Sequence, residues 1–217
     1  MIKAFIFDLD GTLIDTLEDL RNSINQALEK NNYQKCYSYD ETKMLIGAGT
    51  RTLCHRALKG IKHSIEDEEN LFKDFSQFYL LNQLDKTKPY ENVIETLKIL
   101  KSRGYLIAIL SNKVESNVIE IVANLFPKDL FDLVVGQRPN VPLKPDSTSL
   151  RKLINDLHVD KSEVIYVGDS DTDMKTADNL GVKKIAVTYG YRSGEILNKF
   201  HPDFLIDNFI EILKIIN

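Results

Sequence analysis

The regular alternation of apolar and amphipathic segments after residue 90 restricts the possible folds more than any other feature of this chain. Short apolar runs of strand length are predicted at residues 105–110, 131–135, 164–167 and 184–188. Segments with helical periodicity accompany them, at residues 91–103, 114–124, 146–157 and 172–180. Strands that alternate with helices in this way are typical of a parallel sheet with helical crossovers.

Residues 4–10 have the same near-continuous apolar pattern, so we place them in the same buried sheet. Between them and the alternating region the sequence predicts only helices: one capped by Thr16 with Asp19 three residues later, and others at 40–46, 50–59 and 65–84. The predicted architecture is a Rossmann-like, doubly wound α/β core of residues 1–15 and 85–217. An all-helical cap of residues 16–84 interrupts it, and we expect this cap to act as a lid.

Composition excludes other classes of protein. Lys and Arg number 28 against 32 Asp and Glu, which gives a net charge of −4 and argues against a nucleic-acid partner. The longest apolar run is the stretch 105–110, so no membrane partner is expected. Cys36 and Cys54 form no C-x-x-C motif, which argues against a disulfide framework or a zinc site and favours a cytoplasmic protein.

Polar segments follow the predicted strands, and ligands of open parallel sheets bind at the carboxyl ends of the strands. The first segment, D-x-D-G-T, places Asp8 and Asp10 on the same side of an extended chain. Two carboxylates so close repel each other unless one is protonated or a cation lies between them, and either condition suits phosphoryl chemistry. The alternative is a strand that simply ends in a polar turn at Gly11.

The second and third segments contribute positive charge and hydrogen-bond donors. Ser111 and Asn112 are predicted to open a helix whose free N–H groups can bind an anion, although both are also ordinary helix caps. Pro145 is predicted to hold Lys144 extended, with Asp146 capping the next helix. Lys144 would then be a counter-charge for the acids of the first segment.

The fourth segment places Asp169, Asp171 and Asp173 at the end of a buried strand. A calcium loop is excluded, because Met174 replaces the turn glycine and Leu180 stands where the bidentate glutamate would be. The segment therefore favours a divalent cation at a strand terminus. The alternative reading is that Asp171 or Asp173 caps the following helix.

Together and in this order, the four segments resemble the haloacid dehalogenase-like hydrolase superfamily, whose pattern is D-x-D-G-T, Ser/Thr, Lys and G-D-x-x-x-D. Residues 46–53, 111–113, 166–170 and 187–192 are similar to the phosphoglycolate phosphatase-like subgroup. The resemblance implies a Mg²⁺-dependent phosphatase that acts on a small phosphorylated metabolite. Asp10 argues against a dehalogenase, because only an alkoxide leaving group needs that acid.

The resemblance also implies roles for individual residues. Asp8 would be the nucleophile that forms an aspartyl-phosphate, and Asp10 would protonate the leaving oxygen and later activate water. Mg²⁺ would be held by Asp8, the backbone carbonyl of Asp10 and Asp169, with Asp173 as a weaker contributor. The residues implied to bind the phosphate are Thr12, Ser111, Asn112 and Lys144.

The cap is expected to select the substrate, because the core segments bind only phosphate and metal. Arg51 lies near a helix N-terminus that the Gly47–Gly49 turn opens, and it could hold the carboxylate of 2-phosphoglycolate. The alternative is a tight turn with a solvated Arg51. A sugar-phosphate mutase of the β-phosphoglucomutase type, a pyrophosphatase, a nucleotidase and an inactive phosphate-binding module remain competing functions, and a monomer and a homodimer are both open.

Overall fold

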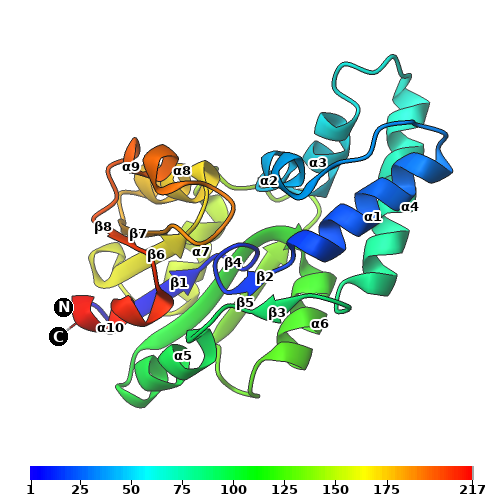
Figure 1. The fold of residues 1–217 in the computed structure, drawn as a ribbon. Helices are drawn as coiled ribbons and strands as arrows, with labels where there is room; N and C mark the ends of the chain where they lie inside the picture. Colours follow the sequence, from blue (N-terminus) through cyan, green and yellow to red (C-terminus); the bar gives the residue numbers. More distant parts are fainter. Residues whose placement is uncertain (217) are drawn as a thin grey trace. The chain divides into compact units, whose positions relative to one another are not determined.

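The computed structural model describes residues 1–216 and divides the chain into two compact units (Figure 1). The α/β unit comprises Met1–Asp15 and Pro89–Asn217, and the helical unit comprises Thr16–Lys88. Short strands β2 (Ile14–Asp15) and β3 (Lys88–Pro89) pair where the chain passes from one unit to the other. Within residues 1–216, no helix combines the length and the apolar character needed to span a bilayer.

The α/β unit contains a six-stranded sheet in the order β5-β4-β1-β6-β7-β8, and every pairing is parallel. Its strands are β1 (Ala4–Phe7), β4 (Leu106–Val114), β5 (Leu133–Gln137), β6 (Val164–Gly168), β7 (Lys183–Val187) and β8 (Phe204–Ile206). The central strand β1 is fully buried, as its unbroken apolar sequence predicts. The doubly wound parallel fold is therefore confirmed.

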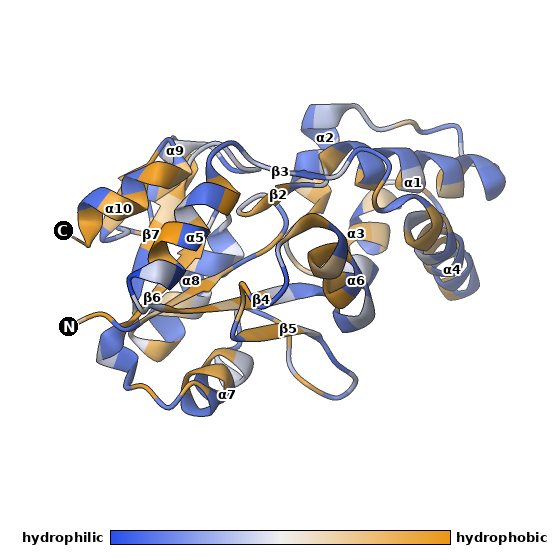
Figure 2. Cartoon of the chain, turned by 90° about the horizontal axis from the view of Figure 1, so that it is seen from below, coloured by the Kyte–Doolittle hydropathy of each residue, from blue (hydrophilic) through white to orange (hydrophobic). Residues whose placement is uncertain are grey.

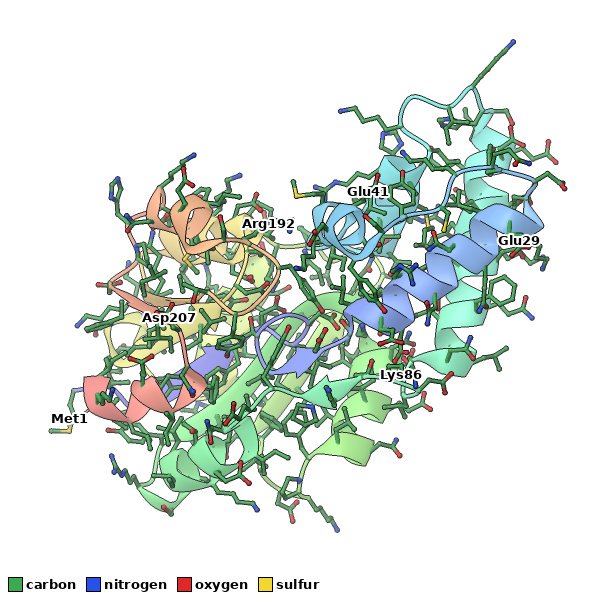
Figure 3. All side chains as sticks on the ribbon, in the orientation of Figure 1. Met1, Glu29, Glu41, Lys86, Arg192 and Asp207 are labelled. Carbon is green, nitrogen blue, oxygen red and sulfur yellow. The ribbon has the colours of Figure 1, made fainter. Side chains whose placement is uncertain are left out.

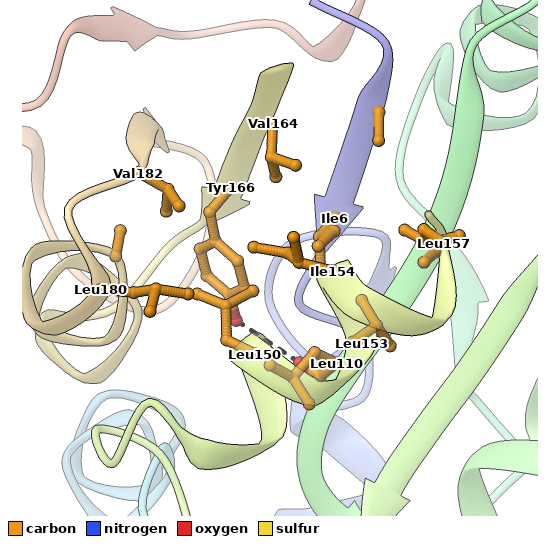
Figure 4. Packing of buried hydrophobic residues seen from close by; sticks show 13 residues of the cluster. Ile6, Leu110, Leu150, Leu153, Ile154, Leu157, Val164, Tyr166, Leu180 and Val182 are labelled. Atoms are coloured by element: carbon orange, nitrogen blue, oxygen red, sulfur yellow. Dashed lines mark hydrogen bonds between the residues drawn. The ribbon is translucent and has the colours of Figure 1, made fainter. Parts of the chain in front are cut away.

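Helices cover both faces of this sheet. They are α5 (Val93–Ser102), α6 (Glu115–Leu125), α7 (Thr148–Asp156), α8 (Asp171–Leu180), α9 (Gly194–Asn198) and α10 (Ile212–Ile215), with 3-10 turns η1 (Lys161–Glu163) and η2 (Phe209–Glu211). Figure 2 shows α5, α6 and α10 on one face and α7 on the other. On the α7 face, Ile6 and Tyr166 pack with Leu150 and Leu180 in one buried cluster (Figure 4). On the opposite face, Phe7 contacts Phe209.

Two local predictions were wrong at the ends of elements, and one alternative reading was right. Strand β4 continues to Val114, so Ser111 and Asn112 lie in a strand and do not open a helix. Helix α7 begins only at Thr148, after Ser147, and Asp146 accepts a hydrogen bond from the Thr148 N–H. Helix α8 is capped by Ser170, and Asp173 completes its capping box, which agrees with the alternative reading for Asp173.

The helical unit contains α1 (Leu17–Lys30), α2 (Tyr39–Leu45), α3 (Thr50–Ala57) and α4 (Ile65–Asn82). Capping boxes begin two of these helices, one formed by Ser38 with Glu41 and one by Ser64 with Asp67. Leu71, the first fully buried residue of α4, belongs to an apolar stripe of that helix. Leu71, Phe75 and Tyr79 are the buried residues of α4 and contribute to the core of this unit.

The predicted capping box of Thr16 and Asp19 was wrong. Thr16 makes no side-chain cap bond, and Asp19 instead accepts hydrogen bonds from the backbone N–H groups of Lys86 and Thr87 and from the Thr87 hydroxyl. Asp19 is 1% exposed, and Lys86 is labelled in Figure 3. The Asp19 carboxylate therefore connects the last residues of the helical unit to the first turn of α1.

Replacing Asp19 by alanine should destabilise the helical unit strongly. The change leaves the backbone N–H groups of Lys86 and Thr87 without their acceptor, the latter in a buried contact, and we expect a loss of about 2–4 kcal/mol in the free energy of unfolding. Urea unfolding measures this, with Asp40→Ala as a control because the Asp40 side chain is 93% exposed in the same unit. Equal stabilities of the two variants would contradict a structural role for Asp19.

Candidate active site

The carboxyl ends of the three central strands bring the predicted site residues together. Asp8 follows β1 directly, Asp169 follows β6, and Ser111 lies near the end of β4. Because β1 pairs in parallel with both β4 and β6, these three positions share one edge of the sheet. The separate polar segments of the sequence therefore form one site in the α/β unit.

Three of the aspartates form a compact acidic cluster. Carboxylate oxygens of Asp8, Asp169 and Asp173 lie within 4.8 Å of one another, and these residues are 8%, 1% and 0% exposed. Asp8 Oδ1 is a buried oxygen. Carboxylate oxygens are the ligands that hard divalent cations prefer, so this donor set fits Mg²⁺. The carboxylate of Asp10 is not part of the cluster.

Lys144 is the buried counter-charge of the cluster. Its Nζ atom lies 2.9 Å from Asp8 Oδ1, an ion-pair contact, and donates a hydrogen bond of 2.7 Å to Asp173 Oδ1. It also donates to the Tyr166 hydroxyl at 3.0 Å. Burial alone would lower the pKa of Lys144, but the carboxylates of Asp173 and Asp8 outweigh it and hold that pKa well above its ordinary value. The ammonium therefore stays charged at neutral pH.

Burial and mutual repulsion raise the pKa values of Asp8 and Asp169. Burial, followed by repulsion from Asp173, raises the pKa of Asp8 to about 7, although Lys144 opposes the shift. Burial also raises the pKa of Asp169, with Asp173 and Asp8 adding to the effect. A cation at this position would relieve the repulsion and favour the ionised carboxylates.

Asp173 is fully engaged by the protein. Its Oδ2 atom accepts from the Ser170 hydroxyl at 2.5 Å and from the Ser170 N–H at 3.1 Å, which completes the capping box of α8. Its Oδ1 atom accepts from Lys144 and from the Tyr166 hydroxyl. Asp173 thus fixes the position of Lys144, in addition to lying near the other two acids.

Asp169 is held by the D-G-T segment and by the loop after β7. Its carboxylate accepts from the Thr12 hydroxyl at 3.1 Å and from the Tyr191 N–H at 2.7 Å. Gly11 has φ +84°, and a Cβ atom there would lie 2.4 Å from Asp169 Oδ2. The glycine of the motif is therefore required both by its backbone conformation and by the close approach of Asp169.

Asn112 positions the backbone of Lys144. Its side-chain amide donates to the Lys144 carbonyl at 3.0 Å, and its carbonyl oxygen accepts from the Lys144 N–H at 2.8 Å. Ser111, which is 5% exposed, accepts from the Lys113 N–H at 3.2 Å. Asn112 therefore contacts the lysine of the acidic cluster, Ser111 precedes it in β4, and phosphate binding by both stays a prediction.

Sequence reasoning assigned no role to two residues of the site, Lys113 and Tyr166. Lys113 Nζ donates to both carboxylate oxygens of Asp10, at 2.9 and 3.0 Å. Tyr166 is fully buried, and Figure 4 shows its ring among apolar side chains with its hydroxyl directed toward Leu110. A tyrosine within an apolar strand is indistinguishable from a core residue in the sequence. Lys113 could have been identified as a site residue, because it belongs to the S-N-K segment that follows a predicted strand.

Arg51 belongs to the helical unit, whereas all the residues above belong to the α/β unit. It lies in the first turn of α3, after Gly49, and its side chain is 61% exposed. The guanidinium forms an ion pair with Glu69 and stacks 4.1 Å from the centre of the Phe72 ring. The turn at Gly47–Gly49 that opens α3 and the nearby cation are both present, and a substrate contact stays a prediction.

A doubly wound sheet that carries an aspartate cluster and a buried lysine at its carboxyl edge is the arrangement of a phosphoryl-transfer enzyme. The chain belongs to the haloacid dehalogenase-like hydrolase family, whose model matches residues 5–187. It is an enzyme of this family, a phosphoric monoester hydrolase.

The chain is similar over its whole length to proteins of one subgroup. It is 32% identical to a phosphoglycolate phosphatase of Aquifex aeolicus, covering 100% of this chain and 97% of that protein. It is 34% identical to a phosphoglycolate phosphatase of Mesorhizobium japonicum, covering 94% and 90%. The crystal structure of a predicted phosphoglycolate phosphatase from Haemophilus somnus matches with a TM-score of 0.93 at 30% identity, covering 100% and 98%.

Proposed function

We propose that this protein hydrolyses 2-phosphoglycolate in a Mg²⁺-dependent reaction that passes through an aspartyl-phosphate on Asp8. Support comes chiefly from the position of Asp8, whose Oδ1 atom is buried and lies 2.9 Å from the Lys144 ammonium. A carboxylate held in this way is oriented by charge and left available for reaction. The named activity of the relatives at 32–34% identity supports the substrate.

In the first half of the proposed reaction, the Asp8 carboxylate attacks phosphorus. A bond forms between Asp8 and the phosphoryl group, and the bond from phosphorus to the ester oxygen breaks. Asp10 gives its proton to the departing alkoxide, while Lys144 stabilises the charge on the transferred group. Transfer of this kind depends mostly on positioning and charge neutralisation, which a rigid buried site supplies.

In the second half, the ionised Asp10 accepts a proton from water as the water oxygen attacks phosphorus. The bond between Asp8 and phosphorus breaks, inorganic phosphate leaves, and both aspartates return to their starting states. Asp10 therefore needs to reach both the leaving oxygen and the water. A mutase would return the phosphoryl group to a sugar, so release of inorganic phosphate distinguishes the two reactions.

The residues present fit one divalent cation. The site holds four acidic side chains and two lysines, which are Asp8, Asp10, Asp169, Asp173, Lys113 and Lys144. The cluster of Asp8, Asp169 and Asp173 has only Lys144 against it, so it keeps an excess of negative charge that a divalent cation can offset. Asp8, Asp169 and the Asp10 carbonyl would hold the ion, with Asp173 nearby. Bound there, Mg²⁺ would neutralise charge on the phosphoryl group during transfer.

Mg²⁺ should stabilise the folded protein more at pH 8 than at pH 5.5. Without metal, the pKa of Asp8 lies at about 7, above its ordinary 3.8, so the folded state binds more protons than the unfolded state between these values. Stability of the metal-free protein therefore falls as the pH rises through that window. Mg²⁺ favours the ionised carboxylates, so its gain in melting temperature should grow with pH. Equal gains at both pH values would contradict the metal assignment.

We place substrate selection in the helical unit. Arg51 is an exposed cation in the first turn of α3, where the free N–H groups of the helix also favour an anion. A small carboxylate such as that of phosphoglycolate fits this chemistry. We further propose that the helical unit closes over the bound substrate and excludes water during formation of the aspartyl-phosphate.

A phosphate-release assay across a panel of phosphorylated metabolites tests the substrate. We expect 2-phosphoglycolate to give the highest kcat/KM, and Arg51→Ala to narrow its lead over an uncharged phosphomonoester by about tenfold. Lys59→Ala, an exposed cation in the same unit, is the control and should leave the ranking unchanged. A tenfold preference for pyrophosphate, a nucleotide or a hexose phosphate would overturn the substrate assignment but leave the phosphatase chemistry intact.

A further inference from the structure

The carboxylate of Asp10 is held by a lysine of its own. Lys113 Nζ lies 2.9 Å from Asp10 Oδ1 and 3.0 Å from Oδ2, so one ammonium contacts both oxygens. The Lys113 side chain is 6% exposed and the Asp10 side chain 13%. Each acid of the D-x-D motif therefore has a separate lysine partner, since Asp8 is paired with Lys144.

An irregularity in β4 places Lys113. Leu110 pairs with Val135 and Val114 with Gln137, so β4 uses four residues where β5 uses two. Such bulges redirect side chains and are frequent beside active sites. Here the irregular stretch is the segment 111–113, and within it Asn112 binds the Lys144 backbone while Lys113 reaches Asp10.

The backbone of Lys113 is confined from the other side by β5. A Cβ atom on Gly136 would lie 2.8 Å from the Lys113 carbonyl oxygen and 2.4 Å from the Glu115 Cα, so no side chain can stand there. The Lys113 N–H donates to Ser111 Oγ at 3.2 Å. A lysine with a fixed backbone and a buried side chain can hold a carboxylate in one orientation better than a mobile surface lysine can.

We propose that Lys113 is a positioning residue that fixes the Asp10 carboxylate in the orientation needed for proton transfer to and from the substrate. This inference rests on the proposed function, in which Asp10 is the acid and the base. A carboxylate held at both oxygens loses rotational freedom, and proton transfer requires the acid within hydrogen-bond reach of the leaving oxygen. Lys113 acts through Asp10 and does not itself react.

Two substrates with different leaving groups separate this role from others. 2-Phosphoglycolate releases an alkoxide that needs a proton, whereas p-nitrophenyl phosphate releases a stabilised phenolate that hardly needs one. We expect Lys113→Met to lower kcat/KM, which reports the steps up to formation of the aspartyl-phosphate, about 30- to 100-fold for phosphoglycolate but less than about threefold for p-nitrophenyl phosphate. Lys113→Arg keeps the charge and should show a smaller loss with the same substrate selectivity.

A double-mutant cycle with Asp10→Asn completes the test. In that background Lys113→Met should add less than about a twofold loss, because Asp10 has no acid–base function left to position. Lys113→Met alone leaves the Asp10 carboxylate without its lysine, which could impair folding. The double variant has an amide at position 10 and avoids this effect. Lys184→Met is the matched control, since Lys184 is 6% exposed and pairs with Asp178. Lys184 lies near the start of β7, whereas the site lies at the carboxyl ends of the strands.

Each outcome separates the two proposals. Equal losses on both substrates, or a full loss that persists beside Asp10→Asn, would mean that Lys113 contacts the substrate directly, and would overturn the positioning role alone. If Asp10→Asn itself leaves both substrates at the wild-type rate, the acid–base role of Asp10 fails, and the positioning role fails with it.

Discussion

Asp8→Asn is expected to abolish phosphatase activity, with a loss of at least ~10⁴-fold in kcat. The amide has nearly the shape of the carboxylate but cannot form an acyl-phosphate, so the chemical step has no nucleophile. The variant should still fold. The site raises the pKa of the Asp8 carboxyl group to about 7, which means that the folded protein already disfavours a charge at this position. The loss should therefore appear in turnover and not in stability.

Phosphate release measured over hours, together with a thermal melt, checks this expectation. Asp156→Asn is a suitable control, because Asp156 is a 45% exposed acid of the same unit that pairs with Lys152 along α7. That variant should keep wild-type activity. An Asp8→Asn protein with a rate near that of the wild type would show that the nucleophile lies elsewhere.

Lys144→Met should damage both activity and stability. The ammonium is 2% exposed and contacts Asp8 and Asp173, so its loss leaves two buried carboxylates facing each other without a counter-charge. We expect kcat/KM to fall ~10³-fold, because the transferred phosphoryl group loses its cation and Asp8 becomes harder to ionise. The free energy of unfolding should fall by about 3–5 kcal/mol.

Adding Asp173→Asn to Lys144→Met separates these two effects. The double variant removes one of the facing carboxylates, so part of the lost stability should return. Activity should not return, because the phosphoryl group still lacks its lysine. Recovery of activity together with stability would mean that Lys144 serves only to balance Asp173.

The sequence predicted the strands of the sheet where burial makes them continuously apolar. β1 and β6 are examples, since each is buried at every position. β8 (Phe204–Ile206) was not predicted, because it has only three residues and two of them are exposed, so it lacks the long apolar run of a buried strand. The end of β4 was missed for another reason: polar residues of an active site replace the apolar pattern there, while the pairing of Val114 with Gln137 continues the strand.

The site was predictable residue by residue but not contact by contact. Motif spacing gave the acids and Lys144, because each belongs to a short segment at a strand end. The pair of Lys113 with Asp10 joins residues 103 positions apart and depends on the irregular register of β4. The Thr12 hydroxyl likewise binds Asp169, 157 positions away. Such contacts require the folded arrangement of strands.

Trapping the phosphorylated protein tests the central claim most directly. Asp10→Asn should accept a phosphoryl group from p-nitrophenyl phosphate, whose leaving group needs little protonation, but should release it slowly because no base activates water. Acid quenching followed by peptide mass spectrometry should then find one phosphoryl group on Asp8. A burst of p-nitrophenol with Asp8 unmodified, or with the phosphoryl group on another residue, would contradict the mechanism.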